Sequence, residues 1–311
     1  MRRMMSSPPV RRLRYLWGAV FLATAVAGTP AAAQVRDMSF GQTIGVERVD
    51  ELSIRDGQLR KAFETTPYSL TTAQIRQRLA SGPVLRFGAD IKVTGFPETG
   101  GATEYEGGIY AGFQTDFGES AAWRYRVTAK FDRLVEDGDW VFNRIRLDQQ
   151  LRYRHDRKNA TTFRLRLGHR NQNETTFVGY DQTEYLLELG HVWRPWQDKR
   201  SLNGTLYAEA RRADLDRFSY DEIGLRLGVR TPINETTSLV SRFAGFTRNY
   251  GTDSGLTARK DTRIKARIGV AHRVLETAKI DLFVGFDHNR SNVATRDFSG
   301  AVAGFSVTYS W

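Results

Sequence analysis

The feature that most constrains this chain is a run in which apolar and polar side chains alternate strictly. Over residues 123–131 the apolar residues occupy every second position, and Arg124, Arg126 and Lys130 stand among the residues between them. A β-strand places two such sets on opposite faces. The run therefore predicts a strand with one apolar face and one basic face.

The same alternation returns along most of the chain after residue 83. Each segment is about 10 to 13 residues long, which is about twice the usual strand of a soluble protein and suits a tilted strand crossing a bilayer. A soluble β-sandwich is the alternative, and these lengths argue against it. Because an open sheet edge in hydrocarbon leaves backbone groups unpaired, a membrane-spanning sheet must close. The sequence thus predicts an all-β fold over residues 84–311, a transmembrane antiparallel up-and-down β-barrel of about 12 strands, with a range of about 12 to 14.

The first 33 residues have the parts of a secretory signal peptide. An apolar stretch covers residues 16–27, and residues 31–33 (AAA) offer an Ala-x-Ala cleavage site. An uncleaved anchor is the alternative, but a spanning helix needs about 20 apolar residues. We expect cleavage after Ala33 and localisation in the outer membrane of a Gram-negative cell. The basic residues that precede the apolar stretch are Arg2, Arg3, Arg11, Arg12 and Arg14.

Residues 34–83 lack the alternation. Residues 71–74 (TTAQ) resemble a capping box, Ile75 and Leu79 are four apart, and Gly82 and Pro83 form a stop signal. These features predict a helix over residues 72–81. We expect residues 34–83 to form a partly helical segment before the barrel, either in the periplasm or inside the lumen.

If the apolar residues face lipid, the polar residues face the lumen. Two interpretations of this basic lining stay open: the charges pair across strands and stiffen the wall, or they attract anions along a path through the barrel. The basic residues expected on the lining are Arg124, Arg126, Lys130, Arg144, Arg146, Arg164, Arg166, Arg226, Arg230, Arg263, Lys265 and Arg267.

Catalytic and cofactor signals are weak. The chain has no cysteine, which excludes disulfides, thiolate zinc sites and cysteine nucleophiles. His169 and His288 are expected near the extracellular rim, where a lipid-modifying site could operate, but the His-x-Ser signature of barrel phospholipases is absent. We expect no enzymatic activity and no catalytic, cofactor-binding or metal-binding residue. Basic residues that alternate with lipid-facing ones do not make a nucleic-acid surface.

The chain ends on an alternating aromatic strand. This pattern is typical of the terminal signal that the outer-membrane insertion machinery reads in barrels. We expect that machinery, outer-membrane lipid and lipopolysaccharide to be partners of the chain. The residues of the expected assembly signal are Phe305, Val307, Tyr309 and Trp311.

Three segments of the last third carry a family resemblance: residues 220–228 (YDEIGLRLG), 259–263 (RKDTR) and 290–293 (RSNV). Over residues 185–311 the chain resembles the C-terminal barrel of surface lipoprotein assembly modifiers. The resemblance implies translocation or surface assembly of a protein or lipoprotein substrate across the outer membrane. The tetratricopeptide repeats of that family's longer members, with a period of about 34 residues, are absent here. An anion-biased, porin-like diffusion channel is the alternative function.

Overall fold

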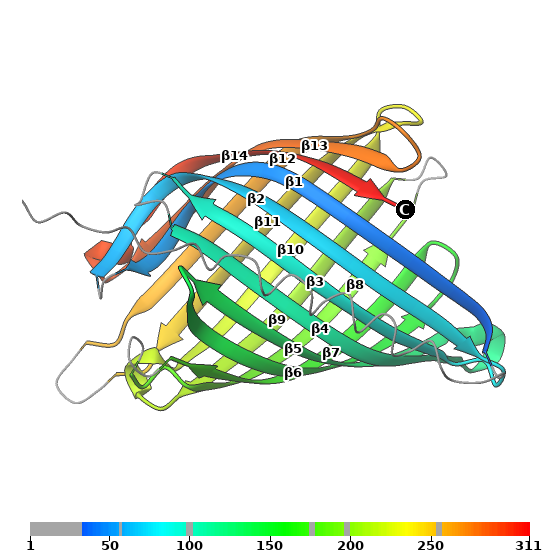
Figure 1. Cartoon of the computed structure of the whole chain (residues 1–311), viewed down its shortest axis with the longest axis horizontal. Helices are drawn as coiled ribbons and strands as arrows, with labels where there is room; N and C mark the ends of the chain where they lie inside the picture. Colours follow the sequence, from blue (N-terminus) through cyan, green and yellow to red (C-terminus); the bar gives the residue numbers. More distant parts are fainter. Residues whose placement is uncertain (1–32, 56–57, 98–101, 174–177, 196–199, 253–256) are drawn as a thin grey trace, which may run out of the picture.

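The chain forms a closed antiparallel β-barrel in the computed structural model, which describes residues 33–55, 58–97, 102–173, 178–195, 200–252 and 257–311 (Figure 1). Within these residues each strand pairs with its neighbour in sequence, and the first strand pairs with the last. Its fourteen described strands fall within the predicted range of 12 to 14. The up-and-down barrel predicted from the alternation is confirmed.

The strands are β1 (Ala33–Arg55), β2 (Gln58–Leu79), β3 (Val84–Phe96), β4 (Ala102–Phe117), β5 (Trp123–Glu136), β6 (Asp139–Arg154), β7 (Asn159–Gln172), β8 (Gln182–Trp193), β9 (Ser201–Ala213), β10 (Tyr220–Pro232), β11 (Thr237–Tyr250), β12 (Lys260–Arg273), β13 (Ala278–Ser291) and β14 (Phe298–Ser310). In the part of the chain that the structure describes, three 3-10 turns connect strands: η2 (Glu119–Ala121), η3 (Asp216–Phe218) and η4 (Ala294–Arg296). We call the end that carries η3 and η4 the loop end, and the end where β14 finishes the terminal end. Among the described residues no helix is long and apolar enough to span a membrane.

The barrel closes along the ladder between β1 and β14. Their register runs from Gly41 opposite Ser310 to Arg48 opposite Ala303. At the terminal end the backbone N–H of Phe40 donates to the carbonyl of Trp311 at 2.8 Å, and the two rings stack with their centroids 6.5 Å apart. This ladder removes the sheet edges that lipid would not tolerate.

The two faces of the wall differ sharply in chemistry. On β13 the side chains of Leu282, Val284 and Phe286 are 45–58 % exposed, whereas Asp287 is 3 % exposed. On β8 the apolar Tyr185, Leu187 and Leu189 are likewise exposed, whereas Glu184 and Glu188, which alternate with them, are buried. Apolar residues outside and charged residues inside are the arrangement of a barrel that crosses a membrane.

The segment expected to precede the barrel supplies its first two strands, so the helix predicted over residues 72–81 is wrong. Residues 72–79 belong to β2, which pairs with β1 and β3. The hydroxyl groups read as caps bond across the sheet instead: Thr71 Oγ1 donates to Gln42 Oε1 at 2.6 Å, and Thr72 Oγ1 to the carbonyl of Gly41 at 3.4 Å. Cross-strand pairing has overridden the local capping pattern. Residues 1–32 of the expected signal peptide lie outside the described residues.

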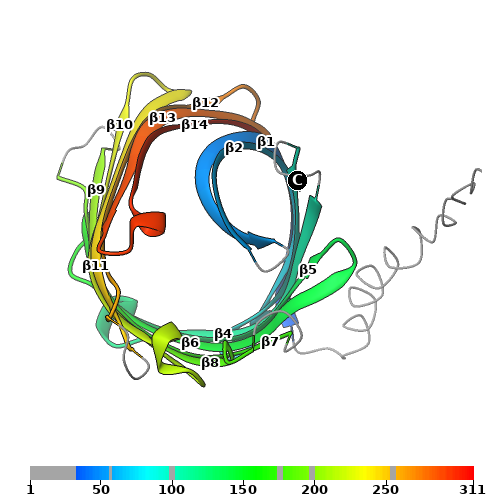
Figure 2. The same ribbon diagram turned by 90° about the vertical axis from the view of Figure 1, so that its left-hand side faces the viewer.

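The β1–β2 hairpin extends beyond the wall that its neighbours form. Residues 49–55 pair only with β2, because the ladder with β14 ends at Arg48 and that between β2 and β3 begins at Tyr68. Figure 2, viewed from the loop end, shows this hairpin in blue curving inward from the wall. The backbone of residues 49–55 and of the start of β2 therefore lies inside the outline of the wall at the loop end.

The orientation of the wall makes a stability prediction. Replacing Val284 by arginine places a charge on the apolar outer face near the middle of β13, so the free energy of unfolding in lipid should fall by about 2–4 kcal/mol. Ile233, which is 62 % exposed in the turn after β10, is the matched control. Arginine there should cost about 0–1 kcal/mol. Denaturant unfolding in lipid vesicles measures both, and equal losses would contradict the assigned outer face.

Candidate functional site

Asp132 gathers basic side chains from β5 and β6. The carboxylate is 1 % exposed and lies 2.9 Å from Lys130 Nζ, 2.6 Å from Arg146 Nη2 and 3.3 Å from Arg144 Nε. Lys130 Nζ also lies 2.8 Å from Asp90 on β3. A buried carboxylate is stabilised only when such partners surround it. This group therefore joins the strands around it and leaves little free positive charge.

A second group of ion pairs joins β6, β7, β8 and β10. Arg164 lies 2.6 Å from Asp148 and 3.0 Å from Glu188, and Arg166 lies 3.0 Å from the same Asp148. Glu188 also accepts a hydrogen bond of 2.6 Å from Arg226 Nη1. Each carboxylate thus serves two arginines, and the pairs reach across strands that are not direct neighbours.

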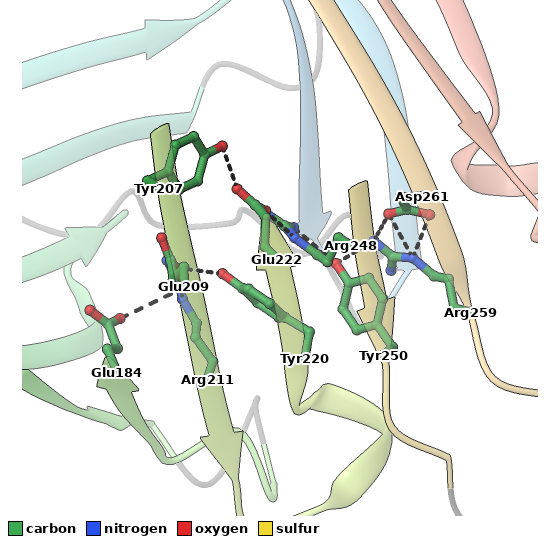
Figure 3. A network of polar contacts seen from close by, with 10 residues as sticks. All are labelled: Glu184, Tyr207, Glu209, Arg211, Tyr220, Glu222, Arg248, Tyr250, Arg259 and Asp261. Atoms are coloured by element: carbon green, nitrogen blue, oxygen red, sulfur yellow. Dashed lines mark hydrogen bonds and ion pairs between the residues drawn. The ribbon is translucent and has the colours of Figure 1, made fainter. Parts of the chain in front are cut away.

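Towards the loop end, tyrosines join the network (Figure 3). Glu222 accepts hydrogen bonds from Tyr207 Oη at 2.7 Å and from Arg248 Nε at 2.6 Å. Tyr220 Oη donates to Glu209 at 2.8 Å, and the Arg248 guanidinium lies 4.2 Å from the centre of the Tyr220 ring. The tyrosines were not predicted as lining residues, although they occupy inward positions of the same alternation as the charged residues. The contacts describe a rigid, neutralised wall.

The ends of β12 and β13 bring two segments of the family resemblance together. Asn292 Oδ1 accepts the backbone N–H of Lys260 at 2.8 Å, and Asn292 Nδ2 donates to the carbonyl of Ala258 at 2.9 Å. Arg259 Nη2 lies 2.6 Å from Asp261, which is 4 % exposed. The RKDTR and RSNV segments thus form one hydrogen-bonded corner at the loop end.

Towards the terminal end, basic residues face one another across the sheet. Arg242 stands opposite Arg267, Arg76 opposite Arg86, and Arg124 opposite Arg152. Like charges directly opposite destabilise a sheet. Arg124 is relieved by Asp116 at 2.7 Å, but the described residues offer no acidic partner within ion-pair distance of Arg242. This half of the wall carries positive charge that the barrel does not neutralise.

A hollow of about 550 Å³ lies over β9–β13 in this region. Its lining carries one acidic residue, Asp281, and six basic ones: Arg226, Arg230, Arg242, Lys265, Arg267 and Lys279. Arg230 has no acidic partner among the described residues, and Arg267 has only the Phe283 ring, 4.6 Å from its guanidinium carbon. The hollow is thus basic, and polar residues of β9 form one side of it.

The structure divides the twelve predicted lining residues into two kinds. Arg126 contacts the amide of Gln114 at 2.7 Å and no acid among the described residues, and Arg230 and Arg267 are likewise without one. Nine have ion pairs: Arg124, Lys130, Arg144, Arg146, Arg164, Arg166, Arg226, Arg263 and Lys265.

The remaining candidate residues are spread out. In the register, His169 faces Thr183 on β8 and His288 faces Ile264 on β12, so the two are on different strand pairs. Within the described residues, no three His, Cys, Asp or Glu side chains are grouped to hold a metal ion. In the terminal strand, Phe305, Tyr309 and Trp311 are 45–66 % exposed.

No protein-family model matches the sequence, and no curated protein matches it significantly. Among solved structures, OmpT of Vibrio cholerae aligns over 91 % of this chain and 99 % of its own, with a TM-score of 0.54 and 9 % identity. CdiB of Acinetobacter baumannii aligns over 91 % of this chain and 64 % of its own, with a TM-score of 0.52 and 9 % identity. Likeness at such identity shows the fold alone, which is that of an outer-membrane β-barrel.

The prediction that the chain is not an enzyme is contradicted by the first of these likenesses. The outer-membrane barrel fold that the two proteins share does not exclude catalysis, so the prediction is withdrawn. The physical reason is that one fold hosts many functions, and a rigid wall of strands holds catalytic groups as well as structural charges. At 9 % identity the likeness places no catalytic residue in this chain.

Paired and unpaired arginines should differ in their effect on stability. Arg164→Gln removes a partner from Asp148 and Glu188, so the free energy of unfolding should fall by about 1–3 kcal/mol. Arg242→Gln removes a charge that faces Arg267. The free energy of unfolding should therefore stay the same or rise by up to about 1 kcal/mol. Denaturant unfolding of the two variants in vesicles compares them. A similar loss in both would mean that Arg242 is as well neutralised as Arg164.

Proposed function

We propose that this chain is an outer-membrane channel that favours the passage of anions. The observation that carries the proposal is the unequal neutralisation of the inner face. Acids contact the basic residues of the middle and the loop end, whereas Arg126, Arg242 and Arg267 towards the terminal end have no acidic partner among the described residues. Uncompensated positive charge inside a low-dielectric wall raises the local concentration of anions.

This proposal combines the two interpretations of the basic lining. The groups around Asp132 and Asp148 account for most of the arginines by cross-strand pairing, which stiffens the wall. Four arginines of the lining have no acidic partner among the described residues: Arg86, Arg126, Arg242 and Arg267. A like-charge pair costs stability, so an anion that passes or binds supplies the counter-charge that the chain itself lacks.

Export and insertion complete the proposal. Residues 1–33 would direct export and be removed after Ala33, and the exposed aromatic side chains of β14 would be the signal for the insertion machinery. Short turns at the terminal end, such as residues 233–236 and 274–277, favour a periplasmic position for that end, because outer-membrane barrels have short periplasmic turns. Outer-membrane lipid and lipopolysaccharide would surround the apolar face.

Reversal potentials in planar bilayers test the channel. In a potassium chloride gradient the wild-type protein should pass chloride in preference to potassium. The double variant Arg86→Gln with Arg126→Gln should lower that preference at least about two-fold, because it removes local positive potential. Arg133→Gln, on the outward side of β5 with Phe131, removes a charge outside the lining and should leave the preference unchanged. A non-conducting barrel, or equal permeability in wild type and double variant, would refute the proposal.

Translocation or surface assembly of a protein or lipoprotein is a second candidate function. The observation that favours it is the corner formed by Lys260, Asp261 and Asn292, because two sequence segments of the assembly-modifier resemblance meet there. Hydrogen bonds between a strand start and the next loop hold both at the loop end, which would be extracellular in this orientation.

A deletion strain separates this candidate from the channel. If the chain assembles lipoproteins, its loss should reduce the lipoproteins that external protease removes from intact cells, as counted by mass spectrometry. The wild-type gene should restore them, and Asn292→Ala should restore fewer, since it breaks the corner. Unchanged surface lipoproteins in the deletion strain would exclude this function.

A further inference from the structure

The basic hollow over β9–β13 is built from rows of residues that face one another across the strands. Its central row consists of Asn203, Gly228, Arg242, Arg267 and Gly285, in that order from β9 to β13. The two arginines are therefore side by side, and each has a glycine on its other side. No side chain from the row's glycines fills the space beside the guanidinium groups.

Close neighbours surround both glycines. A Cβ at Gly228 would lie 2.1 Å from Asn203 Oδ1, and a Cβ at Gly285 would lie 2.2 Å from the carbonyl oxygen of Ala266 and 2.9 Å from Arg267 Cγ. A side chain at position 228 would therefore displace the amide of Asn203, and one at position 285 would meet the backbone of β12.

The neighbouring rows complete the charge of the hollow. On the loop side, Arg226 contacts Glu188 at 2.6 Å and Lys265 contacts Asp287 at 3.4 Å, so each has an acidic partner, which it shares with a second base. On the terminal side, Arg230 stands opposite Ser201 and Val240 and has no acidic partner among the described residues. Three guanidinium groups, from Arg230, Arg242 and Arg267, therefore share one hollow. The carboxylate that also lines it, that of Asp281, lies 2.7 Å from Lys279 Nζ and is paired with that lysine.

We propose that this hollow is a binding site for an anion that carries at least two phosphate groups. A planar guanidinium binds two phosphate oxygens at once, and adjacent arginines suit adjacent phosphates. A monovalent anion would leave most of the charge of the three arginines unbalanced. The volume of about 550 Å³ is within the range of small-molecule sites and leaves room for more than one phosphate group. The hydroxyl groups of Ser201 and Thr205 and the amide of Asn203 add hydrogen-bonding groups on the β9 side.

The site deepens the proposed channel function by naming a class of solute, and it rests on that function only for the route by which the anion arrives. Binding itself is a property of the hollow. The two ideas can therefore fail separately.

Isothermal titration of the folded barrel in detergent tests the site, with inorganic pyrophosphate and inorganic phosphate as probes. Pyrophosphate should bind at least about ten-fold more tightly than phosphate. Arg242→Gln with Arg267→Gln should weaken pyrophosphate about ten-fold or more, whereas Arg86→Gln with Arg126→Gln, the same charge change elsewhere on the lining, should leave its affinity unchanged. Gly228→Ala, which keeps every charge but displaces Asn203, should weaken it as well.

Each outcome bears on the site. Equal affinities for the two probes, or equal weakening by both double variants, would show a diffuse basic lining and overturn the inference. Heat-modifiable migration in gels confirms that each variant is folded before titration. An anion preference in bilayers without pyrophosphate binding would remove the site and leave the channel, and binding without that preference would do the reverse.

Discussion

Closure of the backbone ladder is the constraint on which the rest of this structure depends. A strand in hydrocarbon must pair all its N–H and C=O groups with other strands, so the ladder between β1 and β14 is as necessary as any residue of the wall. Closure also divides the side chains into an outer and an inner set, since successive residues point to opposite faces. The apolar surface of β13 and the buried Asp287 on the same strand are two results of this one geometry.

The inner set then has to neutralise its own charge. A buried ion without a partner costs several kcal/mol, so carboxylates such as Asp132 and Glu188 each serve more than one base. The tyrosines near Glu222 add hydrogen bonds without adding charge. Such a wall is stiff, because moving one strand breaks contacts with several others. A stiff wall can hold unpaired charges at fixed places, which a flexible one would let collapse onto the nearest acid.

The alternation of residues predicted much of this fold because it is a local property of each strand. From residue 84 onwards it placed the strands and their polar faces, and it placed Arg164 and Arg263 on the inner one. It failed for β1 and β2, where Thr71 and Thr72 resemble a helix cap and where the hairpin leaves the wall beyond residue 48. The alternation also could not predict which basic residue pairs with which acidic residue. The Glu188–Arg226 pair joins residues 38 positions apart, and the register and the curvature of three strands decide it.

The difference between paired and unpaired bases arises from the register as well. Sliding β11 against β12 by two residues would keep every apolar residue outside, yet Arg242 would no longer face Arg267. Apolar burial therefore does not explain this pairing of like charges, and neither does strand propensity. The same row also contains Gly228 beside Arg242 and Gly285 beside Arg267, and glycine weakens a strand. Backbone packing accounts for Gly285, since a Cβ there would lie 2.2 Å from the carbonyl oxygen of Ala266, but packing does not account for the facing arginines, whose counter-charge a bound anion would supply.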